Sequence, residues 1–353
     1  MSERSLEEYR SATGRRRALF LGGAILLLLL FLLSLSVGSA RMGFSETLRT
    51  LLGGGDPLTR TIIFRIRLPR ALTAIFAGIA LAVSGAAMQS VLRNPLGSPF
   101  TLGISHASAF GAAFAIVVLG AGSLGSSAVD AVSIVNYYLV AISAFAFSLI
   151  STLAIVGLSR RRGATPEAMI LTGVALGSLF TAAVAAIEYF ADDVELSSII
   201  FWTFGDVGRA SFTDLSVIFV ITLLSLAYFL LNRWRMSALD SGEDSARSLG
   251  VNVKRLRIVG MIVASLATAT VVSFVGIIGF IGLIVPHMVR KIIGPDPKWL
   301  IPSSALLGAM LLLASDTLAR TVISPIVLPV GIVTSFMGAP LFIHLVIKGR
   351  EYW

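Results

Sequence analysis

The sequence predicts an all-α polytopic membrane protein with ten transmembrane helices and both termini in the cytoplasm. The first observation is composition: 56% of the 353 residues are hydrophobic and 13% are charged, whereas soluble domains carry about 25% charged residues. The second is a series of apolar runs, each near the length of about 20 residues that spans a bilayer. The third is the placement of arginines between these runs. Together they exclude a soluble enzyme, a disordered protein and a nucleic-acid reader.

The net charge of +9 is typical of a membrane protein, because Lys and Arg concentrate in cytoplasmic loops and set the topology. The chain has no cysteine. It therefore has no disulfide framework, no thiolate metal site and no thiol nucleophile.

The first span is expected at Ala18–Val37, directly after Arg15–Arg17. A secretory signal peptide has a similar plan, but its apolar core is only about 7–15 residues long. We therefore expect a retained helix, with residues 1–17 as a cytoplasmic tail and residues 18–353 as one ten-helix domain. Cleavage within residues 38–40 is the alternative, and it would leave the later topology unchanged.

Nine further spans follow. Pro69, Pro166 and Pro302 stand near the start of a span, where the first helical turn has no use for the N–H group that proline lacks. The expected spans are Ala71–Leu92, Thr101–Leu119, Ile134–Leu158, Ala168–Phe190, Phe212–Leu231, Ile258–Val275, Gly276–Val289, Leu300–Leu318 and Ile326–Ile347.

The run Ile258–Val289 is too long for one ordinary span and short for two. The distribution of charge favours two spans here. With ten spans in total, each strongly basic loop lies on the same side of the membrane as Arg15–Arg17, whereas nine spans would place the last basic loop on the opposite side. The segment Gly276–Gly282 offers a place to turn. The basic segments are Arg160–Arg162, Arg233–Arg257, Arg290–Lys298 and the tail with Lys348 and Arg350.

One outer segment departs from this pattern. Ala191–Asp214 is acidic, with one arginine, as expected outside. The outer loop of residues 41–70 instead contains six arginines against Glu46 and Asp56. Two explanations stay open: the arginines reach lipid phosphates, or they dock an acidic partner, because guanidinium groups pair well with carboxylates.

The chain contains no phosphate-binding loop, zinc-protease helix, EF-hand or dinucleotide fingerprint. His106, His287 and His344 are far apart in the sequence, so we expect ordinary helix residues and assign neither a metal site nor a catalytic residue. Glu188 and Asp316 lie near span ends, which argues against an ion-coupled transporter and an intramembrane enzyme. We expect a conduit whose energy comes from outside this chain.

The largest inner loop, residues 232–257, contains the sequence SGEDSARSLG. Ser241 could cap a short helix there, with Asp244 at the capping-box position, and the final glycine could end it. Ala246 and Leu249 would then form a small apolar face. A polar linker explains the loop equally well.

Four stretches, taken together, resemble one family. They are IRLPR (66–70) with GIALAVSGAAMQSVLRNPLGSP (78–99), LTGVALGS (171–178), SARSLGV (245–251) with GFIGLIVPHMVR (279–290), and LPVGIVTSFMGAPLFIHLV (328–346). In this order they cover almost the whole chain after the first span. The chain resembles the FecCD-type permease family, the membrane subunit of type II ABC importers for ferric siderophores, haem and vitamin B12.

The resemblance implies the type II importer permease fold in the cytoplasmic (inner) membrane of a prokaryote. It implies a homodimer with the translocation path at its interface, two ATP-binding subunits below it, and a periplasmic or lipid-anchored substrate-binding protein above it. The chain itself would be a transport subunit rather than an enzyme and would bind no cofactor, since ATP and Mg would belong to the partner subunit.

In this family, outer arginines receive glutamates of the binding protein. By motif match they correspond to Arg67 and Arg70 in IRLPR and to Arg320 in SDTLART. Whether Arg60 and Arg65 also take part stays open.

Two inner loops of the family close the cytoplasmic gate. Asn94 and Leu96 in RNPLG match the first loop, and Thr165 and Pro166 match the second, where Thr-Pro-Glu replaces a Ser/Thr pair of the family. The sequence RNPLG also has the composition of an ordinary tight turn between helices.

The segment of residues 240–250 resembles the coupling helices that lie in a groove of the ATPase. The residues implied are Ser245, Ala246, Leu249 and Gly250. The mechanism implied is alternating access, in which ATP binding draws the ATP-binding subunits together and the coupling helices pass that motion to the spans.

The sequence leaves the chelate open, because specificity would reside mainly in the binding protein. A ferric siderophore is the leading expectation, with vitamin B12 and haem as alternatives in the same class and an ion-coupled secondary transporter as the alternative outside it. The small residues of 78–90 and 172–186 suit a wide pathway, and they suit helix packing equally well.

Overall fold

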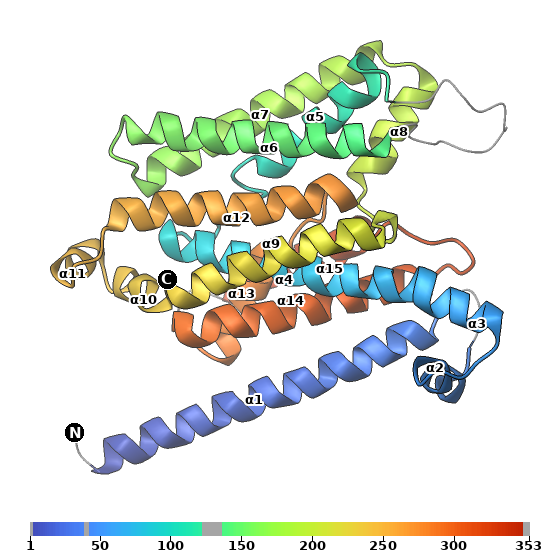
Figure 1. The fold of residues 1–353 in the computed structure, drawn as a ribbon. Coiled ribbons are helices and arrows are strands. Elements are labelled where there is room, and N and C mark those ends of the chain that lie inside the picture. The colour runs from blue at the N-terminus through green and yellow to red at the C-terminus, as the bar shows by residue number, and fades with distance from the viewer. Residues whose placement is uncertain (1–2, 39–41, 122–135, 349–353) are drawn as a thin grey trace.

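The computed structural model describes residues 3–38, 42–121 and 136–348, and the described residues form helices without any strand (Figure 1). Residue 41 of the expected outer loop, residues 134–135 of the fourth expected span and the C-terminal residues 349–353 lie outside this part. The helices are α1 (Glu3–Ser36), α2 (Phe44–Leu51), α3 (Pro57–Thr61), η1 (Ile62–Arg67), α4 (Leu68–Val91), α5 (Ile104–Ala113), η2 (Phe114–Val118), α6 (Tyr137–Arg160), α7 (Pro166–Phe190), α8 (Asp193–Thr203), η3 (Val207–Arg209), α9 (Phe212–Leu231), α10 (Arg233–Asp240), α11 (Glu243–Ser248), α12 (Val253–Val275), α13 (Ile281–Ile292), α14 (Pro297–Ala319) and α15 (Val330–Lys348).

Each expected span overlaps a helix of the described chain, although residues 276–280 of the expected span Gly276–Val289 and residues 326–329 of the expected span Ile326–Ile347 are not helical. Seven helical stretches are long and apolar enough to cross a membrane: α1, α3 to α4, α6, α7, α9, α12 and α14. The other three expected spans correspond to shorter helices, namely α5 with η2, α13, and α15. The predicted all-α membrane architecture is confirmed.

Two segments expected outside the spans are helical. Helix α1 begins at Glu3, so residues 3–17 of the expected cytoplasmic tail are helical and continuous with the first span, and their cytoplasmic location stays a prediction. The expected outer loop of residues 41–70 is largely helical, through α2, α3 and η1, and α4 begins within it. Helix α3 forms because the Asp56 side chain accepts hydrogen bonds from two first-turn N–H groups and Pro57 stands at the first position.

Other helices begin where their capping residues stand. Thr165 accepts a hydrogen bond from the N–H of Ala168, and Pro166 opens α7. Ser211 and Asp214 form a capping box at the start of α9, whose bounds coincide with those of the expected span. The residue types at these positions are sufficient to explain where α7 and α9 begin.

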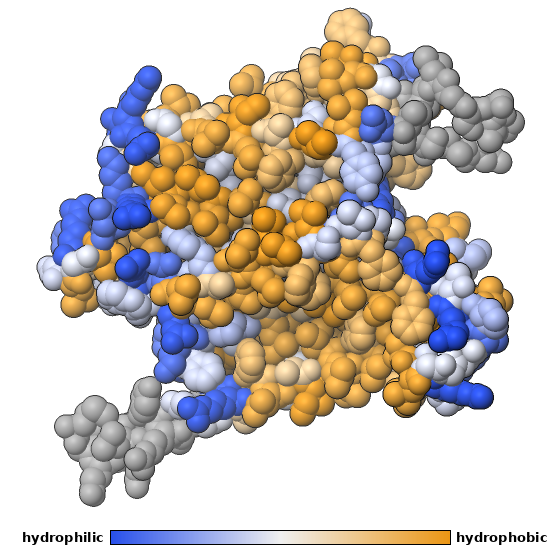
Figure 2. Space-filling model, viewed as in Figure 1, coloured by the Kyte–Doolittle hydropathy of each residue, from blue (hydrophilic) through white to orange (hydrophobic). Residues whose placement is uncertain are grey.

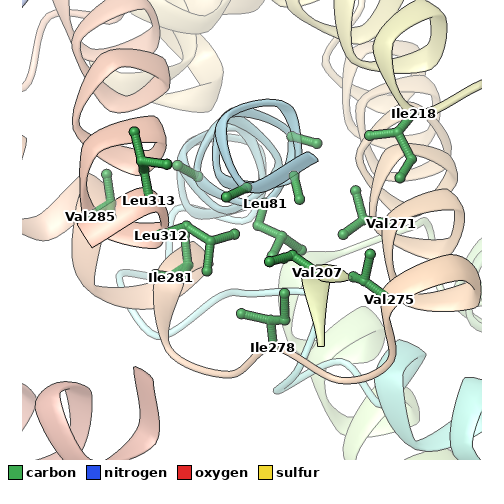
Figure 3. Close-up of a cluster of buried hydrophobic side chains, with 14 of the residues drawn as sticks. Leu81, Val207, Ile218, Val271, Val275, Ile278, Ile281, Val285, Leu312 and Leu313 are labelled. Atoms are coloured by element: carbon green, nitrogen blue, oxygen red, sulfur yellow. The ribbon is translucent and has the colours of Figure 1, made fainter. Parts of the chain in front are cut away.

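Helix α4 lies at the centre of the bundle and packs against α9, α12, α13 and α14. Figure 3 shows Leu81 of α4 among buried side chains from these elements. Gly85 allows the closest approach, because a Cβ atom there would clash with the carbonyl oxygen of Gly282. The small residues 78–90 therefore serve helix packing. Residues 172–186 of α7 are mostly exposed or half-buried in the single chain.

The two ends of the bundle differ in polarity from its middle. Figure 2 shows a broad apolar surface between two ends that carry hydrophilic residues. Helices α10 and α11 lie at one end together with both described termini, and α2 and α3 lie at the other (Figure 1). We call the α10–α11 end the inner end and the α2–α3 end the outer end, as the distribution of basic loops predicts.

The chain is not helical between α12 and α13. Residues 276–280 run beside the first turns of α15, where Cβ atoms added at Gly331 and Gly338 would meet the backbone of Ile277 and the side chain of Phe280. Irregular backbone at membrane depth is tolerated where it is buried in protein or lines a cavity. Residues 277–280 of this segment line a cavity.

Candidate functional site

The outer end holds a set of paired charges that we call the outer ionic cluster: Arg70, Asp206, Asp316 and Arg320. Asp316 on α14 is fully buried. Its Oδ1 accepts a hydrogen bond from Nε of Arg70 at 2.9 Å, and its Oδ2 accepts one from Nε of Arg320 at 3.0 Å. A terminal nitrogen of Arg70 also pairs with Asp206 at 3.0 Å. Because a buried carboxylate needs such compensation, the cluster fastens α4, α14 and the turn before η3 together.

Helix α1 ends against the same cluster. Arg320 donates to the carbonyl oxygen of Val37 at 3.1 Å and to the hydroxyl of Ser34 at 2.8 Å. Arg67 donates to the carbonyl oxygens of residues 35–36 at 2.7 and 2.8 Å. The last carbonyls of a helix lack intrahelical partners, and positive charge there is favourable. The arginines therefore also hold the first span in place.

The three arginines expected to dock an acidic partner are thus engaged within the chain. Arg67 is 5% exposed and Arg320 is 8% exposed. Arginines that are exposed in the same region are Arg49, Arg60 and Arg65. The structure brings the expected docking residues together, and docking itself stays a prediction. Sequence reasoning missed the partners of Arg67 and Arg70 because they lie on distant elements, whereas Asp316 precedes Arg320 by only four residues.

The first expected gate segment is a tight turn after α4. The Asn94 side chain accepts a hydrogen bond from the N–H of Leu96 at 2.8 Å, and its carbonyl accepts one from the N–H of Gly97 at 3.0 Å. The side chain of Leu96 is 48% exposed. The tight-turn interpretation is therefore confirmed, while the gate role stays a prediction.

The second expected gate segment begins α7. Thr165 is its N-cap and Pro166 its first residue, which explains the Thr-Pro-Glu sequence by helix initiation. Thr165 is exposed at the inner end. A gate role is compatible with this position and stays a prediction.

The expected coupling segment forms a short helix, α11, but its details differ from the expectation. Ser241 ends α10 instead of capping α11, whose N-cap is Gly242 without a side-chain hydrogen bond. Ala246 is fully buried while Leu249 is 64% exposed, so the two do not share one apolar face. Gly250 ends the helix with φ +79°, as expected of a left-handed C-terminal position. Ser245 is exposed.

Arg257 near the start of α12 is a site residue that the sequence reasoning missed. It is only 3% exposed, and its guanidinium donates to the carbonyl oxygens of Val91 and Ala164 at 3.0 and 2.9 Å. It also forms an ion pair with Glu243. In the sequence it was grouped with the basic residues that set topology. Its position in the sequence could have indicated burial, because the apolar span that begins at Ile258 follows it directly.

A polar cavity of about 340 Å³ lies at the inner end beside the first gate turn, and Asn94, Asp240 and Arg290 are among its lining residues. Partial desolvation raises the pKa of Asp240 to about 6, against the opposing effect of Arg290 and Arg93. Arg290 donates a hydrogen bond to the side chain of Gln89 on α4. Charged groups at this end therefore line the same cavity as Asn94 of the gate turn.

A larger cavity, of about 840 Å³, lies where the non-helical segment meets α15. It is lined mainly by apolar side chains from residues 98–101, residues 277–280 and α15. Phe280 takes a positive φ of 66°, which is rare for a bulky residue and concentrates at functional sites. Phe336 lines the cavity and is 78% exposed. The volume falls in the range of about 300–1,000 Å³ that is typical of ligand pockets.

Among the described side chains, no group of three or more His, Asp or Glu residues is placed to hold a metal ion. His106 on α5 and His287 on α13 lie on different helices, as does the exposed His344 on α15. Asp316, one of two acidic residues considered for ion coupling, is held by two arginines. The geometry thus describes a bundle of apolar helices with ionic groups at its two ends.

Comparison with known proteins identifies the class. Residues 26–348 match the profile of the FecCD transport family, and the chain belongs to this family. It is similar to a candidate ABC transporter permease of Methanocaldococcus jannaschii (52% identity, covering 92% of this chain and 94% of the relative). It is also similar to the hemin transport system permease HmuU of Yersinia pestis (38% identity, covering 92% and 95%).

A solved structure agrees with this assignment. A candidate metal-chelate type ABC transporter in an inward-facing conformation aligns with a TM-score of 0.82 and 31% identity, covering 94% of this chain and 99% of that chain. The chain is therefore a multi-pass membrane permease of the class of ABC importers that carry metal chelates, haem or vitamin B12.

Proposed function

We propose that this chain is the permease subunit of an ABC importer that moves a metal chelate into the cytoplasm, with a ferric siderophore as the leading substrate. Vitamin B12 and haem are the alternatives within the same importer class. The observation that supports this most is the cavity of about 840 Å³ beside the interrupted α12–α13 connection. An apolar cavity of this size suits a bulky chelate better than a bare ion.

The importer contains two copies of this chain in the cytoplasmic (inner) membrane of a prokaryote. The cavity has an exposed wall that includes Phe336 of α15. Helix α7 also exposes large apolar residues such as Leu171 and Leu179, which a second copy or lipid can cover. A second copy across the cavity would enclose the pathway on the side that the single chain leaves open.

A substrate-binding protein docks on the outer end. Arg67, Arg70 and Arg320 form the expected docking set, and Arg70 is the member with the clearest route to a partner. Its side chain is 14% exposed, and its partner Asp206 is 31% exposed. A glutamate of the binding protein can compete with Asp206 for the same guanidinium, because a partly exposed ion pair is weak.

Two ATP-binding subunits dock at the inner end. Leu249, exposed on α11, supplies an apolar contact for a groove on such a subunit, next to Ser245, Ala246 and Gly250 of the same segment. Asn94, Leu96, Thr165 and Pro166 form the inner gate. ATP binding moves α11, and the two gate segments move with it, which opens one side of the pathway at a time.

The test is purification of the tagged chain from native membranes, followed by reconstitution in proteoliposomes. We expect an ATP-binding subunit to co-purify, and we expect ATP-dependent uptake of a radiolabelled ferric siderophore in the presence of the binding protein. Uptake of haem or cobalamin instead would change the substrate but keep the class. A chain that purifies alone and moves substrate without ATP would overturn the proposal.

A further inference from the structure

Arg257 is a buried cation at the inner end. A buried cation lowers the stability of the fold unless its N–H groups form hydrogen bonds. Its side chain is 3% exposed. Three of its nitrogens are satisfied, by Val91, Ala164 and Glu243. A planar guanidinium holds several acceptors in fixed directions, which an ammonium group cannot do. The three acceptors are therefore held in one geometry relative to α12.

The three acceptors belong to three different parts of the inner end. Val91 is the last residue of α4, directly before the first gate turn. Ala164 directly precedes Thr165, the N-cap of α7 in the second gate segment. Glu243 is the first residue of α11, the expected coupling helix. One side chain thus contacts the coupling helix and the residues that lead into both gate segments.

Packing supports the same connection independently of charge. Ala246 of α11 is fully buried in a cluster that also contains Val91, Leu92 and Ala164. The apolar side of α11 is therefore packed into the same buried cluster as the residues that precede both gate segments. Close-packed groups of this kind move together because interiors are dense and deform little.

We propose that the ion pair between Glu243 and Arg257 positions the coupling helix against both gate segments and transmits the movement of α11 to them. The inference rests on the proposed function, since it assumes that a partner subunit moves α11. Arg257 is a positioning residue in this scheme, because it acts through the gate segments and contacts neither ATP nor substrate. When α11 shifts, the carboxylate of Glu243 draws the guanidinium, and the carbonyl oxygens of Val91 and Ala164 follow.

Glu243 has a second, exposed partner that provides a matched control. Arg247 pairs with the other carboxylate oxygen at 3.3 Å, but its side chain is 64% exposed. An exposed pair within one helix contributes little, and it connects α11 only to itself. Loss of Arg247 should therefore leave transmission intact, whereas loss of the Arg257 contact should not.

The experiment uses the full chain with its ATP-binding subunits in proteoliposomes and two readouts, ATP hydrolysis and the conformation of the gate turn. Because the chain has no cysteine, Leu96→Cys introduces a single thiol in that turn. Its rate of labelling by a maleimide is measured with and without Mg-ATP. When Glu243 is unchanged, the labelling rate should differ between samples with and without Mg-ATP.

In that background, Glu243→Gln should keep ATP hydrolysis and the association with the ATP-binding subunit, while the ATP-dependent change in labelling falls about tenfold, the size expected for a lost charged hydrogen bond. Arg257→Lys should give the same result with its charge retained. Arg247→Gln should behave as the unsubstituted background. Glu243 is partly exposed, so its variant should fold even if the Arg257 variant does not.

Two outcomes would overturn the inference while leaving the proposed function intact. One is a normal ATP-dependent labelling change in Glu243→Gln. The other is loss of the ATP-binding subunit in that variant, which would place Glu243 at the subunit interface instead. Absence of any ATP-binding subunit, or of ATP-dependent uptake, with the wild-type chain would instead contradict the proposed function itself.

Discussion

The Nε atom of Arg70 on α4 lies 2.9 Å from Oδ1 of Asp316 on α14, although 246 positions separate the two residues. The other oxygen of Asp316 accepts a hydrogen bond from Arg320, which also contacts the end of α1. One fully buried carboxylate thus determines how three spans meet at the outer end. The arginines that we expect to dock the binding protein are therefore the same residues that hold these spans together, and experiments must separate the two roles.

Replacing Asp316 should destabilise the fold. Asp316→Asn leaves Arg70 and Arg320 without their shared anion, and breaking a buried ion pair costs about 3–5 kcal/mol. The apparent Tm of the detergent-purified chain should fall clearly. Asp193→Asn, at an exposed position of α8, should change stability by no more than about 0.5 kcal/mol. Equal melting of both variants would show that the outer ionic cluster does not support the fold.

Replacing Arg70 should weaken docking with little loss of the fold. In Arg70→Ala, Asp316 keeps its pair with Arg320, so the buried carboxylate stays compensated. If the binding protein uses Arg70, its affinity should fall about tenfold or more, as expected for a charged hydrogen bond. Binding measured against immobilised permease at two salt concentrations checks this.

The exposed Arg65 provides the comparison for that experiment. Arg65→Ala should change mainly the association rate and its salt dependence, since a peripheral charge steers the encounter. If Arg65→Ala lowers the affinity and Arg70→Ala does not, the docking surface consists of exposed arginines and the motif-based assignment is wrong.

Exposed Leu249 should matter for coupling and not for stability. It is 64% exposed, so Leu249→Ser removes little burial within the chain. We expect normal expression and melting, with transport per ATP hydrolysed reduced several-fold. Leu52→Ser changes a residue that is 81% exposed at the outer end and should leave both quantities unchanged. Normal transport in the Leu249 variant would remove this residue from the coupling contact.

The contact between α4 and α13 should not tolerate a methyl group. A Cβ atom at Gly85 would clash with the backbone of Gly282, where no flexible side chain can move away. Overpacking costs about 1–3 kcal/mol and occasionally more, so Gly85→Ala should lower both Tm and monodisperse yield.

Gly157 on α6 is the matched helical glycine, because a Cβ atom there meets nothing within 4 Å. Gly157→Ala should be neutral or stabilising, since alanine favours the helix. Tolerance of alanine at both positions would mean that α4 and α13 separate more easily than their packing indicates.

Stability should depend on pH through Asp240. Its pKa in the folded chain is raised to about 6 from the model-compound value of 3.8, so the folded state binds the proton more tightly than the unfolded state. The free energy of unfolding should therefore fall as the pH rises from about 4 to about 6 and then level off. Asp240→Asn should remove this part of the slope. A slope that persists in the variant would assign it to other groups.

Much of the architecture was predictable because membrane partition is a local property. The bounds of α9 coincide with the expected Phe212–Leu231, since an apolar run between polar caps needs no partner to be recognised. The short inner helix near Leu249 and the left-handed Gly250 were also predictable from local residue types. The N-cap of that helix was not predictable, because Ser241 is the C-terminal capping residue of α10.

Hydropathy along the chain was sufficient to predict the positions of the apolar helices and the membrane class, because each span's free energy of transfer is a sum over its own residues. Pairing between distant residues depends on how the helices pack, and no local pattern contains that information. Asp316 pairs with Arg70 only in the folded bundle, which brings the two within hydrogen-bonding distance. The same holds for Arg257, which pairs with Glu243 and donates a hydrogen bond to Val91. Folding thus turned residues that looked like ordinary topological charges into the connections between the spans.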